Sequence, residues 1–210
     1  MRPLPLLAGL MTLVAAWVGP LPMMAEGSFA AHMAMHVLVI AVAAPLFALG
    51  IAGSTVDPAR RLPWLFAPVL ASLVELVVVW GWHAPAAHHA SRESTLFLAL
   101  EQASYLAVGL LLWLSAFGGD RASRRERAPA GIGGLLLTSM HMTLLGVLLA
   151  TASRPLFIHA SPAPLGLTAL EDQHLGGVLM LVFGGVSYLV GGLYLLAGLL
   201  RKEHDIASAG

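Results

Sequence analysis

The sequence predicts an all-α fold, a polytopic bundle of about six transmembrane helices with both termini in the cytoplasm. Three observations carry this prediction. The chain of 210 residues is 58% hydrophobic and only 10% charged, whereas soluble domains contain about 25% charged residues. Its apolar residues gather in long runs. Its Lys and Arg residues fall mostly on one side of the connections between those runs.

The apolar runs predict a single integral membrane domain over residues 1–210. Most of them are close to the length of about 20 residues that a helix needs to cross the hydrocarbon core. The first run resembles a signal peptide, but Met23 suits the position before a cleavage site at Ala25 poorly, so we expect a retained helix. The expected spans are 4–19, 30–50, 64–82, 95–117, 131–152 and 173–200.

The basic residues predict the orientation of these spans. When six helices are threaded, only Arg92 and Arg154 lie on one side, and the positive-inside rule makes that side extracytoplasmic. The loops expected there are 20–29, 83–94 and 153–172. The zero net charge gives no reason to expect nucleic-acid binding. The residues expected on the cytoplasmic side are Arg2, Arg60, Arg61, Arg121, Arg124, Arg125, Arg127, Arg201 and Lys202.

The last segment contains Gly177, Gly184 and Gly191, which are seven residues apart and form one stripe along a helix. Small residues allow helices to approach closely in lipid. We expect this stripe to pack against other helices of the same chain, and a homodimer interface is the alternative.

Seven of the nine histidines fall at the extracytoplasmic ends of the segments. Of the others, His141 lies in the middle of the fifth segment and His204 lies on the cytoplasmic side. Imidazoles gathered on one face of a membrane protein predict a site for a metal, a haem or protons. The chain has no Cys, so metal ligands must come from His, Met, carboxylate or backbone oxygen. The extracytoplasmic histidines are His32, His36, His83, His88, His89, His159 and His174.

His32 and His36 are the strongest ligand candidates. Their i, i+4 spacing places both on one face of a helix, about 6 Å apart along its axis. Two imidazoles in this arrangement can bind one metal ion, but they cannot both be axial ligands of one haem. Met33 and Met35 flank the pair and add thioether sulfurs as candidate ligands.

A polar core is expected deeper in the membrane. Counting 1.5 Å per residue places His36, Glu75, Glu101 and His141 within about one to two helical turns of each other in depth. An ionisable group at this depth costs about 2.5–3.5 kcal/mol and is functional by default. The alternative is a network of hydrogen bonds that only holds the helices together. Met140, next to His141, is a further soft ligand candidate.

The remaining candidates lie at the predicted mouth of the bundle. His83 follows the third span and is expected near the site. Asp172 is expected to be the N-cap of the last helix, with His174 one turn inside the mouth. His88 and His89 are expected to be solvated in the loop after the third span.

These residues resemble the motifs of the CtaG-type cytochrome c oxidase assembly proteins, in the family's order, from about residue 28 to 195. The chain departs from that pattern at Gln102, where the family often has His. The Leu-Tyr that often follows the Trp-His-x-Pro motif is absent, and the chain is short for the family. The motifs are His32-Met33-x-x-His36, Ala44-Pro45-Leu46-x-x-Leu49-Gly50, Trp82-His83-x-Pro85, Leu100-Glu101-Gln102, His141 with Leu145-Gly146, Arg154-Pro155-Leu156-Phe157, and Asp172-Gln173-His174-Leu175-Gly176-Gly177.

The resemblance implies a non-enzymatic factor of the bacterial inner membrane that binds or relays copper, as Cu(I), for haem–copper oxidases at the extracytoplasmic face. Its expected partners are oxidase subunits, extracytoplasmic copper chaperones and the lipid bilayer. Imidazole and thioether ligands suit Cu(I). The candidate metal ligands are His32, His36, His83, His141, His174, Met33, Met35 and Met140, and the expected supporting acids are Glu75, Glu101 and Asp172.

Two other functions fit the same residues. A membrane metallohydrolase would hold zinc and a nucleophilic water with three histidines and an acid, here His36, His83, His174 and Asp172. A haem b electron carrier would use axial histidines from two helices, such as His36 and His141.

Overall fold

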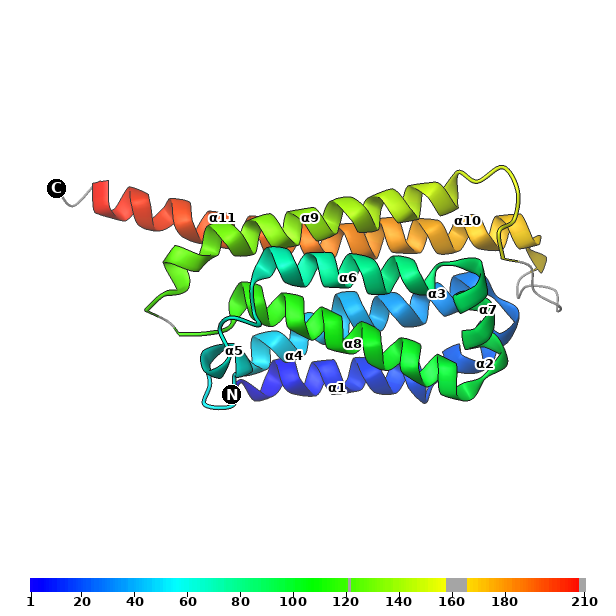
Figure 1. Cartoon of the computed structure of the whole chain (residues 1–210), viewed down its shortest axis with the longest axis horizontal. Coiled ribbons are helices and arrows are strands. Elements are labelled where there is room, and N and C mark those ends of the chain that lie inside the picture. The colour runs from blue at the N-terminus through cyan, green and yellow to red at the C-terminus, as the bar shows by residue number, and fades with distance from the viewer. Residues whose placement is uncertain (121, 158–165, 208–210) are drawn as a thin grey trace.

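The computed structural model describes residues 1–120, 122–157 and 166–207, and every regular element in this part of the chain is a helix (Figure 1). Four continuous helices are long and apolar enough to cross a membrane, and two bent helix pairs raise the number to six if each pair is one span. The expected helical membrane bundle is therefore confirmed, with four to six candidate spans. The continuous helices are Phe29–Ile51, Thr95–Phe117, Arg125–Ala150 and Ala169–Arg201.

The first bent pair consists of α1 (Pro3–Trp17) and α2 (Leu21–Gly27), which meet at 41°. The break falls at Gly19-Pro20, because a proline disfavours helical geometry in the residue before it. A loop was expected over residues 20–29, and this prediction was wrong because α2 forms there. Ala25 of α2 is buried against the next helix.

The second span is one continuous helix of three parts: α3 (Phe29–Val37), a π-helical segment η1 (Leu38–Ala43), and α4 (Ala44–Ile51). Pro45 explains the change of register, because it lacks the N–H that would bond to the Ala41 carbonyl in an α-helix. That carbonyl instead accepts a hydrogen bond from Ser187 Oγ at 2.7 Å.

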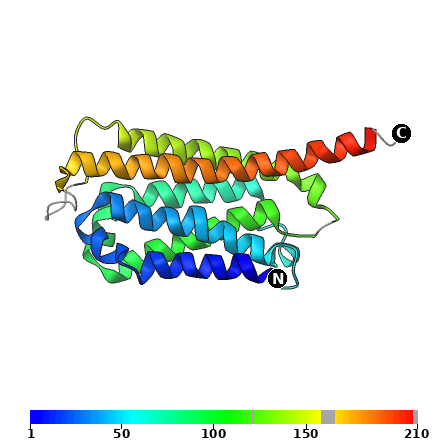
Figure 2. The same ribbon diagram turned by 180° about the vertical axis from the view of Figure 1, so that it is seen from behind.

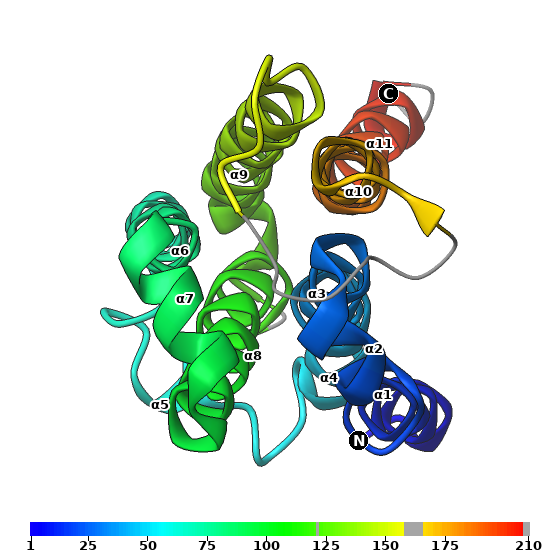
Figure 3. The ribbon, with the colours of Figure 1, turned by 90° about the vertical axis from the view of Figure 1, so that its right-hand side faces the viewer.

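The second bent pair follows the short helix α5 (Pro58–Arg61) and consists of α6 (Pro68–Trp82) and α7 (Pro85–Glu93). The two helices meet at 70°, and α7 lies across the end of the bundle between α6 and α8 (Figure 3). The segment expected at 64–82 begins as a helix only at Pro68, where proline occupies the first turn. The loop expected over 83–94 was a wrong prediction, because Pro85 starts a further helix there.

The remaining spans are long helices. The first of them, α8 (Thr95–Phe117), has the expected bounds, and α9 (Arg124–Ala150) begins earlier than expected. The last span combines α10 (Ala169–Leu179), a second π-helical segment η3 (Met180–Gly185) and α11 (Val186–Ala207).

The glycine stripe of the last span packs within the chain, as expected. A Cβ atom at Gly177 would lie 2.5 Å from the Ala150 nitrogen, and one at Gly191 would lie 2.6 Å from the Trp113 ring. At Gly184 the neighbour is Met142, with its Cε at 3.1 Å. Glycine therefore allows α10–η3–α11 to contact α8 and α9 closely.

Different helices form the two ends of the bundle. Helix α1 begins and α11 ends at one end, and α2 and α7 cover the other (Figures 1 and 2). One cavity at the end with the termini is lined by Arg2, Arg125 and Arg201. The termini are therefore on one side, and the assignment of that side to the cytoplasm stays a prediction.

Candidate metal centre

The helix that carries His32 and His36 is fixed at its start by another span. Ser28 is the N-cap of α3. Asp172 of α10 accepts hydrogen bonds from Ser28 Oγ at 2.7 Å, from the Phe29 nitrogen at 2.6 Å and from the Ala30 nitrogen at 3.3 Å. The carboxylate thus satisfies backbone donors at the first turn of α3 and sets where His32 lies.

Asp172 was expected to cap its own helix, and this was wrong. Thr168 is the N-cap of α10, and its side chain forms a capping box with Glu171. Asp172 therefore has both carboxylate oxygens available for α3. The sequence pattern offers several acceptors before the last span and cannot reveal that one of them caps a different helix.

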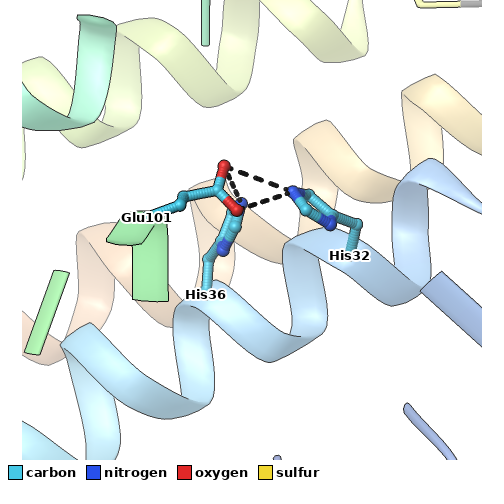
Figure 4. A group of neighbouring side chains, drawn as sticks. All are labelled: His32, His36 and Glu101. Carbon is cyan, nitrogen blue, oxygen red and sulfur yellow. Dashed lines mark hydrogen bonds and ion pairs between the residues drawn. The ribbon is translucent and has the colours of Figure 1, made fainter. Parts of the chain in front are cut away.

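His32 and His36 of α3 converge on Glu101 of α8 (Figure 4). His32 Nε2 lies 3.3 Å from Glu101 Oε2, and His36 Nε2 lies 3.5 Å from Glu101 Oε1. Each residue offers one ligand atom, and the three atoms lie within 4.8 Å of one another. The expected histidine pair therefore forms a group with the expected glutamate of the fourth span.

The group is closed off from solvent. His32 is 1% exposed, His36 is 3% exposed and Glu101 is fully buried. Among the described residues, His36 Nε2 and Glu101 Oε2 make no hydrogen bond, and no Lys or Arg pairs with Glu101. A buried carboxylate is stabilised by a nearby positive charge, which Arg92 of α7, a protonated imidazole or a metal ion can supply here. Two imidazoles and a carboxylate are ligand types that copper and zinc both accept.

Three further side chains surround the group. The His88 ring centre lies 4.9 Å from that of His32, the Tyr105 ring centre lies 4.5 Å from that of His36, and Ser91 Oγ donates to Glu101 Oε1 at 3.4 Å. His88 is only 3% exposed, so the expectation that it is solvated was wrong.

The burial of His88 follows from the helix that replaces the expected loop. In α7, His88 and Ser91 are three residues apart and share the buried face. Pro85 as a helix start was the signal that could have found this face. His89 is exposed, as expected, and pairs with Glu93 at 3.1 Å.

Gln102, where the resembling family often has His, contacts His36 from the other side. Trp17 Nε1 donates to Gln102 Oε1 at 3.3 Å, and Gln102 Nε2 donates to His36 Nδ1 at 2.8 Å. Because an indole N–H can only donate, Trp17 holds the amide with its nitrogen toward His36. A neutral His36 ring therefore carries its proton on Nε2, and a metal at Nε2 requires the Gln102 amide to turn.

His83 and Met33 lie beside this group. His83 follows α6 as its C-cap, and its ring centre lies 5.9 Å from that of His36. His83 Nε2 lies 3.3 Å from Met33 Sδ. Both residues are buried.

Three other ligand candidates do not join the group. Met35 is buried with Ala25 and Ala31 on a different face of α3. Met140 is 69% exposed on the outside of α9. His174 Nε2 donates to the Ala152 carbonyl at 2.9 Å. Of the histidines left aside, His159 lies outside the described residues, and His204 belongs to α11 at the other end of the bundle.

Of the four residues expected to share a polar core, His36 and Glu101 come together, while Glu75 and His141 contact other partners. Glu75 is fully buried and accepts a hydrogen bond from Tyr188. His141 lies against α6 near the Ser72 backbone. Depth along the helices was predictable, but the direction in which each side chain points depends on helix rotation.

The comparisons with known proteins agree with the resemblance of the motifs. A family described as cytochrome c oxidase caa3 assembly factor (Caa3_CtaG) matches residues 1–202. Comparison with the curated proteins and with the solved structures gave no match. Because the matched region covers nearly the whole chain, this protein belongs to the cytochrome c oxidase caa3 assembly factor family.

Proposed function

We propose that this assembly factor binds copper through His32, His36 and Glu101 at the extracytoplasmic end of the bundle, and relays it to a haem–copper oxidase. The observation that carries the proposal is the buried group itself, whose three ligand atoms lie within 4.8 Å of one another. A metal ion bound here would add a positive charge directly beside the Glu101 carboxylate, which among the described residues has no Lys or Arg within ion-pair distance.

The surroundings of the group suit a site that receives a metal and passes it on. The group contacts His88 and Ser91 of α7, and α7 lies at the end of the bundle opposite the start of α1 (Figure 1). The Gln102 hydrogen bond favours the wrong tautomer of His36 for a metal at Nε2, which lowers affinity and favours release. Extracytoplasmic copper chaperones and oxidase subunits are the proposed donors and acceptors.

The first test is copper retention by the full-length protein. We expect purified protein, loaded anaerobically with Cu(I) against a chromophoric chelator, to keep copper that the His32→Ala/His36→Ala double variant loses. His89→Ala is the matched control, because His89 is exposed on α7. In cells, we expect the double variant to lower the copper content of the oxidase. Equal copper retention by wild type and double variant would refute the proposal.

Zinc is the second candidate metal, because two histidines and a glutamate are also the protein ligands of catalytic zinc in some hydrolases. The same experiment separates the two functions. Retention of zinc in preference to copper, together with hydrolysis of a lipid-like substrate, would favour the hydrolase. An optical spectrum without a Soret band excludes haem b.

A further inference from the structure

We propose that His83 and Met33 form a second copper position, selective for Cu(I), directly beside the His32–His36–Glu101 group. The inference rests on the proposed copper function and extends it from one ion to two neighbouring positions. It rests on the contacts that the two ring nitrogens of His83 make.

The proton on His83 can be assigned from its hydrogen bond. His83 Nδ1 lies 2.7 Å from the Val79 carbonyl oxygen. A carbonyl oxygen can only accept, so Nδ1 carries the hydrogen. A neutral imidazole has one N–H, and Nε2 therefore presents a lone pair. This arrangement, with one nitrogen held by a backbone carbonyl, is also how proteins orient histidine for a metal at the other nitrogen.

The lone pair of His83 Nε2 faces a second group without hydrogen. Met33 Sδ lies 3.3 Å away, and a thioether sulfur can only accept. No proton lies between the two atoms when the ring is neutral. His83 is only 8% exposed and Met33 is fully buried, and among the described residues no carboxylate lies within ion-pair distance of His83. A cation bound by both atoms resolves this arrangement.

The two atoms select the metal. Thioether sulfur is a soft ligand that favours Cu(I), whereas harder cations such as Mg²⁺, Ca²⁺ and Mn²⁺ prefer oxygen. The chain has no Cys, so methionine is its only source of sulfur ligands.

The packing around Met33 holds its side chain in place. Met33 is fully buried. A Cβ atom on Gly176 of α10 would lie 3.0 Å from Met33 Cγ and 2.5 Å from the Phe29 ring. Glycine at this position therefore gives Met33 and Phe29 the space that they occupy.

The second position adjoins the first. The ring centres of His36 and His83 are 5.9 Å apart, and those of His32 and His36 are 4.2 Å apart. A copper ion can therefore move between the positions by exchanging one ligand at a time. The Met33–His83 pair would act as the soft half of the site, and the group with Glu101 as the harder half.

The test is copper X-ray absorption of the full-length protein loaded with Cu(I) in thiol-free buffer, with the copper content measured in parallel. We expect wild type to hold two copper ions per chain and to show sulfur scattering. Met33→Leu, a change that nearly preserves volume, should lose the sulfur signal and one copper. His83→Gln should lose the same copper, and Met35→Leu, the matched control, should lose neither.

The outcomes separate this inference from the proposed function. A wild-type protein that binds one copper with nitrogen and oxygen scatterers only would overturn the second position and leave the proposed function standing. A sulfur signal that persists in Met33→Leu would also overturn it. The wild-type spectrum decides without any variant, so misfolding of Met33→Leu does not prevent the test. A protein that binds no copper contradicts both proposals.

Discussion

At the scale of single residues, metal binding as proposed depends on which nitrogen of each histidine carries the proton. His83 has its Nε2 lone pair exposed to Met33 because the Val79 carbonyl holds Nδ1. His36 is in the opposite state, because Gln102 donates to its Nδ1. Val79 and Gln102, which are not proposed ligands, therefore fix different tautomers in the two rings.

Replacing Gln102 by Glu should strengthen copper binding. A carboxylate at this position accepts from both Trp17 Nε1 and His36 Nδ1, so it stabilises the tautomer with a free Nε2. Partners of this kind change metal affinity by about 10–100-fold, and we expect the apparent Kd of Gln102→Glu for Cu(I) to fall about tenfold in chelator competition. In a His36→Ala background the same change should have no effect. Unchanged or weaker binding in Gln102→Glu would show that Gln102 does not control His36.

At the scale of helices, α3 takes its position from α10. The Asp172 carboxylate bonds to Ser28 and to the backbone of the first turn of α3. Helix α3, which carries His32 and His36, is therefore joined to α10 by a contact between residues more than 140 positions apart in sequence.

Asp172→Ala should destabilise the fold and weaken metal binding together. The change leaves the Phe29 and Ala30 N–H groups buried without their acceptor, at about 1–3 kcal/mol for each group. We expect a loss of about 2–4 kcal/mol, measured as a lower Tm in detergent, and reduced copper retention. Glu171→Ala, which removes only the exposed capping box of α10, should cost less than about 1 kcal/mol. Similar Tm losses in the two variants would contradict the role of Asp172.

Glu75 contacts Tyr188, which lies close to both π-helical segments, η1 and η3. Tyr188 donates to Glu75 and lies 3.5 Å from the Ile40 carbonyl in η1, while Ser187 bonds to the neighbouring carbonyl of Ala41. Both donors lie just after η3. This contact stabilises two helices at the places where their α-helical hydrogen bonding is interrupted.

Glu75→Gln should therefore be tolerated, because the amide keeps a hydrogen-bond partner for Tyr188. We expect its Tm and copper retention to match wild type. Tyr188→Phe should lower the Tm, by about 1–3 kcal/mol of stability, because it leaves buried acceptors without a donor. A Glu75→Gln protein that stays folded but retains no copper would instead place Glu75 in the metal pathway.

The sequence predicted the spans better than the contacts between them. Thr95–Phe117 has the expected bounds because hydropathy alone defines where a helix leaves the membrane. His32 and His36 were predictable because both lie on one helix at a fixed spacing. The partners of Glu75, the burial of His88 and the contact of Asp172 with α3 depend on how helices rotate against each other. No local pattern records that rotation.

At the scale of the whole molecule, the function depends on which end of the bundle faces the cytoplasm. The His32–His36–Glu101 group contacts α7. Helices α2 and α7 cover one end of the bundle, and α1 begins and α11 ends at the other (Figure 1). Arg2, Arg125 and Arg201 meet near the termini, and the positive-inside rule places such residues in the cytoplasm. On this assignment, the His32–His36–Glu101 group lies toward the extracytoplasmic side.

The absence of Cys makes this orientation directly measurable. Ala86 is exposed on α7, near the metal group, and Val56 is 52% exposed between α4 and α5. A membrane-impermeant maleimide should label Ala86→Cys in intact cells, and Val56→Cys only after the inner membrane is permeabilised. The wild-type chain, which cannot react, is the control. Labelling in the reverse order would put His32, His36 and Glu101 within reach of cytoplasmic copper. The donor of the metal would then have to be a cytoplasmic carrier, even if every ligand assigned above is correct.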